Sequence, residues 1–201
     1  MLIGIDLDNT LICYDHAFRA VAKRSGLLPE AFAGDKAAVK RALLAQRPDG
    51  FLWERLQGLV YGRDIEDATL FDGVEKFVAG CRSRRHRLVV VSHKTELAHH
   101  DPERTNLRSA ALCWMNRRGF FDRDRLGLQR TDVFFEATRE DKVRRIAALA
   151  TDLFIDDLAE VLGHPDMPAD CRKILFGTQP QDRFEQYASW PELCDAFFAG
   201  S

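Results

Sequence analysis

The sequence predicts an α/β protein with a doubly wound, mainly parallel, Rossmann-like sheet and a small α-helical cap inserted after the first strand. Three observations support this prediction. Short apolar runs recur along the chain, helical segments separate them, and one long stretch contains only helical patterns. Short, uninterrupted apolar runs are typical of strands buried on both faces, as in parallel sheets covered by helices.

Five apolar runs are the predicted strands, and each ends at a polar residue or a glycine. The runs cover residues 2–5, 88–91, 133–135, 153–155 and 174–176. In open parallel sheets, ligands bind at the carboxyl ends of the strands. The polar residues that follow these runs are therefore the first candidates for a functional site.

Helices are predicted between the strands from apolar spacing and from capping residues. Residues 73–85 place apolar side chains at helical spacing, and Gly119 ends a helix predicted over 104–118. Thr138 begins a further helix with a capping-box-like sequence. Ser189 is the expected N-cap of the last helix, because proline two residues later is tolerated in a first turn.

Residues 15–70 contain no convincing strand. Helices are predicted there at 16–25, 35–46 and 51–61, each followed closely by a glycine or a proline. We therefore predict a core domain of residues 1–14 and 71–201, and a small helical cap of residues 15–70. A helical insertion directly after the first strand is expected to act as a lid over the strand ends.

Composition and charge exclude several classes of protein. The 201 residues are 46% hydrophobic, enough for one core and a small additional lobe. Lys and Arg total 29 against 31 Asp and Glu, so nothing indicates nucleic-acid binding. No run approaches the roughly 18 apolar residues of a membrane span. The first residues lack the basic start and cleavage site of a signal peptide.

The cysteines indicate a reducing compartment. Five are scattered along the chain and none forms a Cys-x-x-Cys pair. This spacing argues against a zinc knuckle and against a disulfide framework. We therefore expect a cytoplasmic protein.

The first strand leads directly into two aspartates. Asp6 and Asp8 are separated by one residue, so their side chains point the same way if the extended geometry continues. Two carboxylates that close together do not both ionise easily unless a cation intervenes. Such a pair allows one group to act as a nucleophile and the other as a general acid and base.

Three more features follow later strands. Ser92 ends the second long strand, with His93 and Lys94 after it, and a hydroxyl with loop amides at that point can hold phosphate oxygens. Lys142 occupies the first turn of a helix, where the helix dipole favours acids, so an anion nearby would explain it. The acidic pair Asp156-Asp157 ends another strand, and oxygen ligands of this kind suit Mg²⁺.

These residues, in this order, resemble the haloacid dehalogenase (HAD) superfamily. The family's first motif, Asp-x-Asp-x-Thr, is present at residues 6–10, and its second, a serine or threonine, falls on Ser92. The third motif, a lysine, falls on Lys142, and the acidic fourth motif on residues 156–157. The motifs run from residue 6 to residue 157, so the resemblance covers most of the chain.

The resemblance implies a role for each motif residue. Asp6 would attack phosphorus and form an aspartyl-phosphate, and Asp8 would be the catalytic acid and base. Thr10 would steady the first loop, while serine and lysine hold the phosphoryl group. The implied metal ligands are Asp6, Asp8 through its backbone carbonyl, Asp156 and Asp157. The predicted phosphate-binding residues are Thr10, Ser92, His93 and Lys142.

The implied function is that of a magnesium-dependent phosphatase acting on a small phosphorylated metabolite, such as a phosphosugar or a nucleotide monophosphate. Asp8 argues against dehalogenation, because dehalogenating members lack the second aspartate. The helical insertion resembles the cap type called C1. Two alternatives stay open: a phosphotransferase or phosphomutase of the same fold, and a catalytically silent regulatory or binding protein. The sequence predicts neither the substrate nor the oligomeric state.

Several other side chains have less specific interpretations. The segment 93–101 contains three histidines, and we interpret it as a substrate-contacting loop rather than a metal site. Trp53 belongs to an apolar helix stripe, which is more typical of packing than of a pocket. Arg19, Lys23 and Lys40 of the predicted cap are candidates to meet a second anionic group of the substrate.

Overall fold

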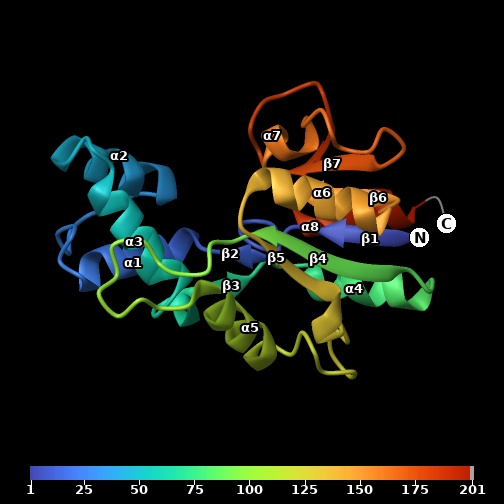
Figure 1. Cartoon of the computed structure of the whole chain (residues 1–201), viewed down its shortest axis with the longest axis horizontal. Helices are drawn as coiled ribbons and strands as arrows, with labels where there is room; N and C mark the ends of the chain where they lie inside the picture. The colour runs from blue at the N-terminus through green and yellow to red at the C-terminus, as the bar shows by residue number, and fades with distance from the viewer. Residues whose placement is uncertain (200–201) are drawn as a thin grey trace. The chain divides into compact units, whose positions relative to one another are not determined.

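A computed structural model describes residues 1–199, and Figure 1 shows the order of its elements. The strands are β1 (Leu2–Ile5), β2 (Ile12–Cys13), β3 (Thr69–Leu70), β4 (Arg87–His93), β5 (Val133–Glu136), β6 (Leu153–Asp156), β7 (Arg172–Phe176) and β8 (Glu185–Tyr187). The α-helices are α1 (Asp15–Arg24), α2 (Lys36–Gln46), α3 (Phe51–Tyr61), α4 (Val74–Ser83), α5 (Leu107–Arg117), α6 (Arg139–Leu149), α7 (Ala159–Leu162) and α8 (Trp190–Phe198). Short 3₁₀ turns, η1 and η2, occupy Ile65–Asp67 and Arg130–Asp132.

The chain forms two compact units. The first, which we call the core unit, comprises residues 1–12, 70–94 and the chain from Gly119 on. The second, the helical unit, comprises residues 13–69 and 95–118. The predicted division into a core and a cap of residues 15–70 stays a prediction. The helical unit differs from that cap mainly by including residues 95–118.

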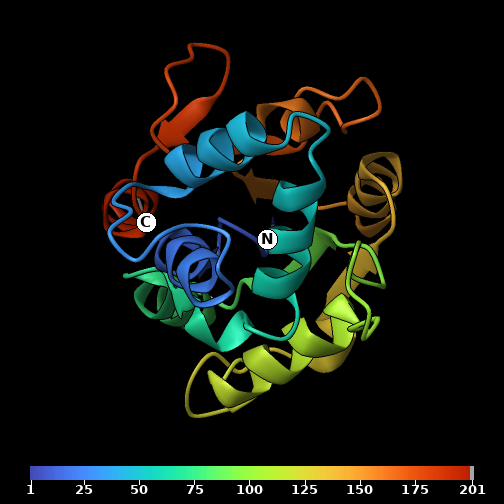
Figure 2. The same cartoon turned by 90° about the vertical axis from the view of Figure 1, so that its left-hand side faces the viewer.

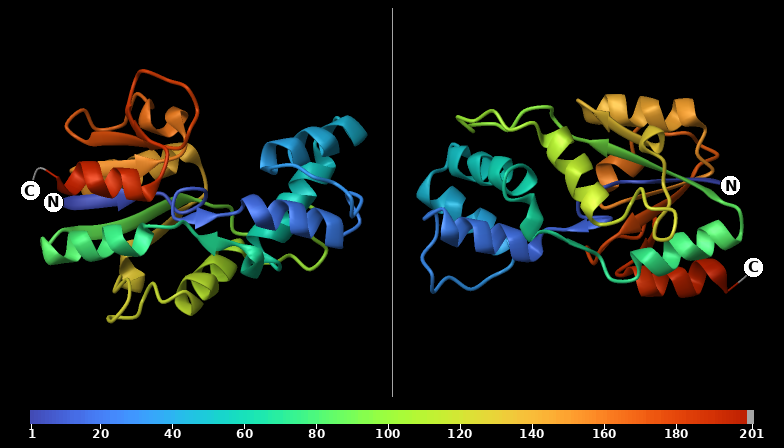
Figure 3. Two further views of the ribbon diagram at one scale, coloured as in Figure 1. Left: turned by 180° about the vertical axis from the view of Figure 1, so that it is seen from behind. Right: turned by 90° about the horizontal axis from the view of Figure 1, so that it is seen from below.

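The core unit is built on a six-stranded sheet in the order β5-β4-β1-β6-β7-β8. Every pairing in it is parallel, which confirms the predicted doubly wound α/β fold. Helices α6 and α7 cover one face, and α4 and α8 lie side by side on the other (Figures 1 and 3). The chain runs outward from β1 to β4 and β5, then returns to β6 on the other side. The crevice at such a reversal is where ligands bind.

Register in the centre of the sheet brings the ends of β1, β4 and β6 together. Ile5 of β1 is the register partner of both Val90 and Ile155. Gly4 is required here, because a Cβ at this position would lie 2.4 Å from the Phe154 ring. The residues after Ile5 therefore emerge between the ends of two neighbouring strands.

Helices α1, α2 and α3 of the helical unit pack against one another (Figure 2), and aromatic side chains of α1 and α3 are in contact. Phe18 of α1 is buried and stacks on Trp53 of α3, with ring centroids 5.0 Å apart. Tyr14 and Tyr61 close the cluster at near-perpendicular ring angles. Within this unit the apolar stripe that contains Trp53 serves packing, as its helical spacing indicates.

Residues 95–118 belong to the helical unit because they pack closely on α3. A Cβ on Gly58 would lie 3.0 Å from the His99 carbonyl oxygen, and one on Gly62 would lie 3.0 Å from Thr105. His100 adds a contact, since its Nε2 lies 3.0 Å from Glu54 Oε2. Gly58 within α3 and Gly62 at its C-cap thus let the loop after β4 lie against the helix.

Most predicted elements are confirmed, and the differences lie in polar or very short segments. The polar edge strand β8 was not expected, because it lacks an apolar run; Arg172 holds it through two hydrogen bonds to Glu185. Helix α5 begins at Leu107 rather than 104, because the Asn106 side chain caps it. Among residues 1–199 no helix is long and apolar enough to cross a bilayer.

Candidate active site

The turn after β1 presents Asp6 and Asp8 at the end of the strand. Asp6 is buried, and its backbone N–H donates to the Ile155 carbonyl of β6 at 2.9 Å. The Leu7 carbonyl then accepts hydrogen bonds from both Leu11 and Ile12, which closes a tight turn. Asn9 adopts a positive φ of 62° in this turn, a conformation that asparagine tolerates better than most residues.

The backbone of this turn at Thr10 is hydrogen-bonded to another element of the core unit. Trp190 of α8 is buried and donates its indole N–H to the Thr10 carbonyl at 2.8 Å. The Thr10 Oγ1 atom is also buried. The turn that carries the carboxylates is therefore fixed to the last helix as well as to the sheet.

Strand β4 carries Ser92 and Lys94 toward the same side. Ser92 pairs with Phe135 of β5, and the Lys94 backbone N–H donates to the Glu136 carbonyl at 2.9 Å, continuing the ladder. Side chains alternate along a strand, so His93 points the other way. Ser92 and Lys94 are buried, whereas His93 is exposed and its Nε2 lies 3.0 Å from the Ala137 carbonyl oxygen.

Two buried lysines lie among the carboxylates. Lys142 of α6 has its Nζ 2.6 Å from Asp6 Oδ1 and 2.7 Å from Asp156 Oδ2. Lys94 has its Nζ 2.7 Å from Asp8 Oδ2. The Thr138 hydroxyl accepts from the Asp141 N–H and so begins α6 one turn before Lys142. Helix α6 thereby holds an ammonium group between the ends of β1 and β6.

The carboxylates form a set that suits a hard divalent cation. One oxygen from each of Asp6, Asp156 and Asp157 lies within 4.8 Å of the others. Asp8 adds a fourth carboxylate, and the ammonium groups of Lys94 and Lys142 lie among these acids. Mg²⁺ is a hard cation that prefers oxygen ligands such as these carboxylates. The residues present therefore fit the metal that the sequence predicted.

The surroundings of the site favour the charged form of Lys142 and disfavour the ionised form of Asp6. The pKa of Asp6 lies well above its usual range. Burial raises it most, the charge of Lys142 opposes this rise only in part, and the nearby carboxylates add to it. Burial lowers the pKa of Lys142, but the charges of Asp156 and Asp6 outweigh it, so that the net shift is upward. A cation beside Asp6 would favour its ionised form.

Two buried hydroxyls complete the arrangement. Among the described residues, Thr10 Oγ1 and Ser92 Oγ have no hydrogen-bond partner. Buried polar atoms are nearly always hydrogen-bonded, so an unpaired one needs an explanation. A ligand that brings oxygen atoms to this edge of the sheet would supply the partners.

Comparison with known proteins was made at the level of sequence and of structure. No protein-family model matches the sequence, and no curated protein matches it. Solved structures do match. A haloacid dehalogenase-like hydrolase from Streptococcus pneumoniae superposes with a TM-score of 0.60 at 14% identity, over 98% of this chain and 97% of the other. The chain has the haloacid dehalogenase fold.

Other structures with this fold carry different names. A HAD family hydrolase from Deinococcus radiodurans, with bound phosphate and sodium, has a TM-score of 0.58 at 14% identity over 98% and 94% of the two chains. Protein Tyrosine Kinase A from Mycobacterium tuberculosis has a TM-score of 0.58 at 16% identity over 98% and 97%. At such identities the likeness establishes the HAD fold alone.

The HAD fold brings together most of the residues that the sequence singled out. Asp6, Lys142 and Asp156 are joined by ion pairs, and Asp157 lies beside them. His93 lies on the opposite side of β4 from Ser92, and its contribution to phosphate binding stays a prediction. Lys94 was missed as a site residue. Its signal was available, because Ser92 and Lys94 have the same period-two spacing as Asp6 and Asp8.

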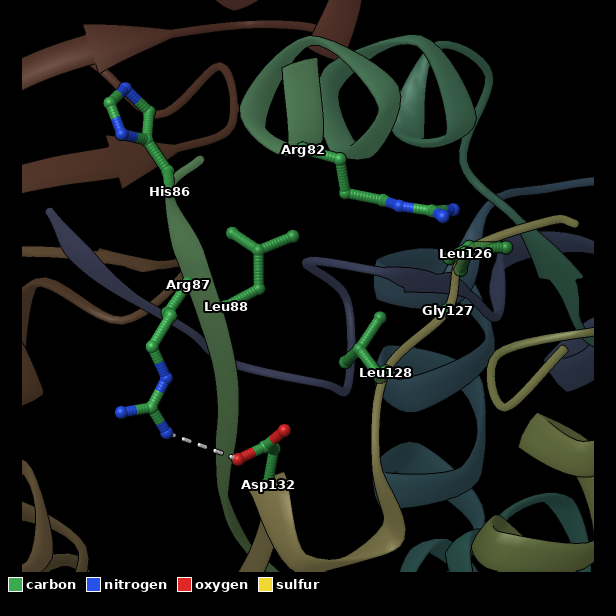
Figure 4. A pocket seen from close by; sticks show the side chains of 8 residues that line it. All are labelled: Arg82, His86, Arg87, Leu88, Leu126, Gly127, Leu128 and Asp132. Carbon is green, nitrogen blue, oxygen red and sulfur yellow. Dashed lines mark ion pairs between the residues drawn. The ribbon is translucent and has the colours of Figure 1, made fainter. Parts of the chain in front are cut away.

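The HAD-fold core unit also contains a small cavity at the opposite end of β4, shown in Figure 4. Its volume is about 180 Å³, and Leu88, Leu126 and Leu128 line it. Its charged side chains are engaged: Arg82 donates to the carbonyls of Arg123 and Arg125, and Arg87 pairs with Asp132. This cavity lies at the amino-terminal end of β4, whereas Ser92 and Lys94 lie at its carboxyl end.

Proposed function

We propose that the protein is a magnesium-dependent phosphatase that hydrolyses a small phosphate monoester through an aspartyl-phosphate on Asp6. The observation that carries this proposal is the buried array in which Lys142 bridges Asp6 and Asp156, with Asp157 beside them. Burying several charges is costly, so an array of this kind is better explained by a reaction than by stability.

The first step transfers the phosphoryl group to Asp6. A carboxylate oxygen of Asp6 attacks phosphorus, and the bond from phosphorus to the leaving oxygen breaks. That oxygen keeps the bonding electron pair and takes the proton of Asp8. In the second step water attacks the phosphorus of the aspartyl-phosphate and gives its proton to Asp8. The bond between phosphorus and Asp6 then breaks, with the electron pair returning to the carboxylate.

The remaining residues bind the phosphoryl group and neutralise its charge. The Ser92 hydroxyl and the Lys142 ammonium group are suited to donate to phosphoryl oxygens, with the Thr10 hydroxyl beside them and His93 as a further predicted contact. Asp6, Asp156, Asp157 and the backbone carbonyl of Asp8 would hold Mg²⁺. When bound, this ion supplies positive charge that offsets the charge of the transferring group, which is the main requirement of phosphoryl transfer.

We propose a small phosphorylated metabolite as the substrate. The bound phosphate and sodium of the Deinococcus radiodurans structure support a phosphate-binding role for this fold. The name of the Mycobacterium tuberculosis structure favours one alternative, transfer of the phosphoryl group to an acceptor other than water. Both reactions share the aspartyl-phosphate, and they differ only in what attacks it.

A phosphate-release assay tests the proposal. The protein is incubated with p-nitrophenyl phosphate and a panel of phosphorylated sugars and nucleotides, with Mg²⁺ or with a chelator. We expect Mg²⁺-dependent release of phosphate that Asp6→Asn abolishes. Asp166→Asn is the matched control, because the Asp166 side chain is 76% exposed. Full activity in Asp6→Asn would contradict the mechanism, and a phosphorylated product without free phosphate would favour transfer.

A further inference from the structure

The contact between Lys94 and Asp8 has no counterpart among the motifs that led to the proposed function. Lys94 Nζ lies 2.7 Å from Asp8 Oδ2, and the Lys94 side chain is 2% exposed against 16% for Asp8. The pair lies next to the array of Lys142, Asp6 and Asp156, which has its own ammonium group. Two buried lysines thus serve two different aspartates of the same turn.

Backbone geometry fixes Lys94 where it meets Asp8. Its N–H donates to the Glu136 carbonyl of β5, so the residue continues the β4 ladder beyond His93. The strand alternation then places its side chain on the Ser92 side. Asp8 is held as well, since it forms an isolated bridge with Ile12 inside the hydrogen-bonded turn. Both partners therefore approach from rigid backbone.

Stability alone does not account for this pair. Taking two charges out of water is costly, and a well-packed apolar pair is often as stable as a buried ion pair or more stable. A lysine that continues a strand at a sheet edge could also extend into water, as long lysine stems commonly do. A buried ammonium group fixed on Asp8 thus indicates a role at Asp8.

We infer that Lys94 is a positioning residue that anchors Asp8 through its Oδ2 atom and so orients the carboxyl group for both proton transfers. The inference rests on the proposed function, in which Asp8 gives a proton to the leaving oxygen and later takes one from water. With Oδ2 paired with Lys94, the carboxyl group keeps one orientation through both proton transfers. Rotation about the last bond of an aspartate is otherwise broad, so an unanchored carboxyl group would be aimed poorly.

This role makes kinetic predictions that differ from those of substrate binding. Replacing Lys94 by methionine keeps the stem and removes the anchor, so kcat should fall by roughly 10-fold to 100-fold with little change in KM. The loss should be larger with phenyl phosphate than with p-nitrophenyl phosphate, because the poorer leaving group depends more on the proton. A lysine that bound the substrate phosphate directly would instead raise KM with both substrates.

A double-mutant cycle provides the test. Lys94→Met, Asp8→Asn and the double variant are compared with the wild-type protein on both aryl phosphates, with Mg²⁺ present. If Lys94 acts through Asp8, Lys94→Met should change kcat by no more than about twofold in the Asp8→Asn background. Lys94→Arg should restore part of the activity. Lys76→Met is the matched control, because Lys76 forms an exposed pair with Asp195.

The outcomes separate this inference from the proposed function. If the wild-type protein releases no phosphate, the proposed function fails and the positioning role fails with it. Two results with an active wild-type protein would overturn the inference alone. Either the losses of kcat caused by the two substitutions multiply in the double variant, or Lys94→Met raises KM without lowering kcat; in both cases Lys94 does not act through Asp8. Equal losses on both substrates would also overturn it. Thermal unfolding of each variant shows whether a loss of activity follows from a loss of folded protein.

Discussion

Two lysines of the core unit and two of the helical unit have opposite surroundings. In the core unit, Lys142 and Lys94 are buried and pair with carboxylates at strand ends. In the helical unit, Lys36 lies 4.8 Å above the Phe18 ring and Lys40 lies 5.6 Å from the Trp53 ring centre, on the outside of an aromatic cluster.

The difference separates charges that cost little stability from charges that are expensive to bury. A lysine whose stem covers an aromatic ring keeps its ammonium group largely in water and gains packing contacts with the ring. Carboxylates buried with ammonium groups lose solvation that the ion pairs only partly return. The helical unit therefore uses its charges at little cost in stability, whereas the core unit concentrates costly charges at one edge of its sheet.

The largest effect is expected from Lys142→Met. This change removes the ammonium group between Asp6 and Asp156, so kcat/KM should fall by about a thousandfold, as when other charge-stabilising groups are lost. It also leaves buried carboxylates without their ammonium partner, which should lower the free energy of unfolding by about 3–5 kcal/mol when no Mg²⁺ is added. Steady-state kinetics and thermal unfolding measure the two effects. A variant within tenfold of wild-type activity would contradict the role of Lys142.

Trp53→Ala should mainly affect stability. Its ring is stacked on Phe18 inside the helical unit, so truncation should lower the free energy of unfolding by about 3–5 kcal/mol. Urea denaturation followed by fluorescence checks this, with Trp53→Phe as a control that keeps most of the packing. A loss below about 1 kcal/mol would show that the aromatic cluster is not what holds the unit together.

Magnesium should stabilise the protein in a pH-dependent way. Burial raises the pKa of Asp6 in the folded, metal-free protein. The stability that its proton contributes is complete below the pKa of the unfolded chain and is lost as pH rises through the raised pKa. We therefore expect saturating Mg²⁺ to stabilise by about 2–3 kcal/mol near neutral pH and by less in mild acid. Calorimetry measures this; an equal shift at both pH values would contradict it.

The smallest effect is expected from Lys36→Met, the same substitution made in the helical unit. Lys36 is partly exposed, and its Nζ lies 3.5 Å from the Tyr61 hydroxyl. Loss of the cation–π contact should cost no more than about 1 kcal/mol. Chemical denaturation of the Lys36 and Lys142 variants, run together, sharpens the comparison. Equal losses would mean that the two units do not differ in how they use lysine.

Sequence patterns predicted the parts of the fold that depend on burial and on strand ends. Apolar runs located the central strands, and the residues after them located the carboxylates, because a parallel sheet brings strand ends to one edge. Strand β8 was missed because its pairing with β7 is supported by polar contacts such as Arg172 with Glu185. No apolar periodicity marks such a strand.

For the candidate site, sequence spacing indicated which residues lie at the strand ends but not the direction of every side chain. His93 was chosen as a phosphate contact and Lys94 was not, although alternation along β4 turns Lys94 toward Ser92 and His93 away from it. The attachment of residues 95–118 to α3 depends on the close approach at Gly58 and Gly62, which is a tertiary contact. Spacing along the sequence contains the alternation of side chains on a strand, but it does not contain tertiary contacts of this kind.

The central claim, that Asp6 becomes phosphorylated, has a direct measurement. The wild-type protein is mixed with substrate and Mg²⁺, quenched during turnover and treated with borohydride, which reduces an aspartyl-phosphate to homoserine. Peptide mass spectrometry then locates the modified residue. We expect homoserine at position 6 and none in the Asp6→Asn protein. Phosphate release with position 6 unmodified, or modification at another residue, would contradict it.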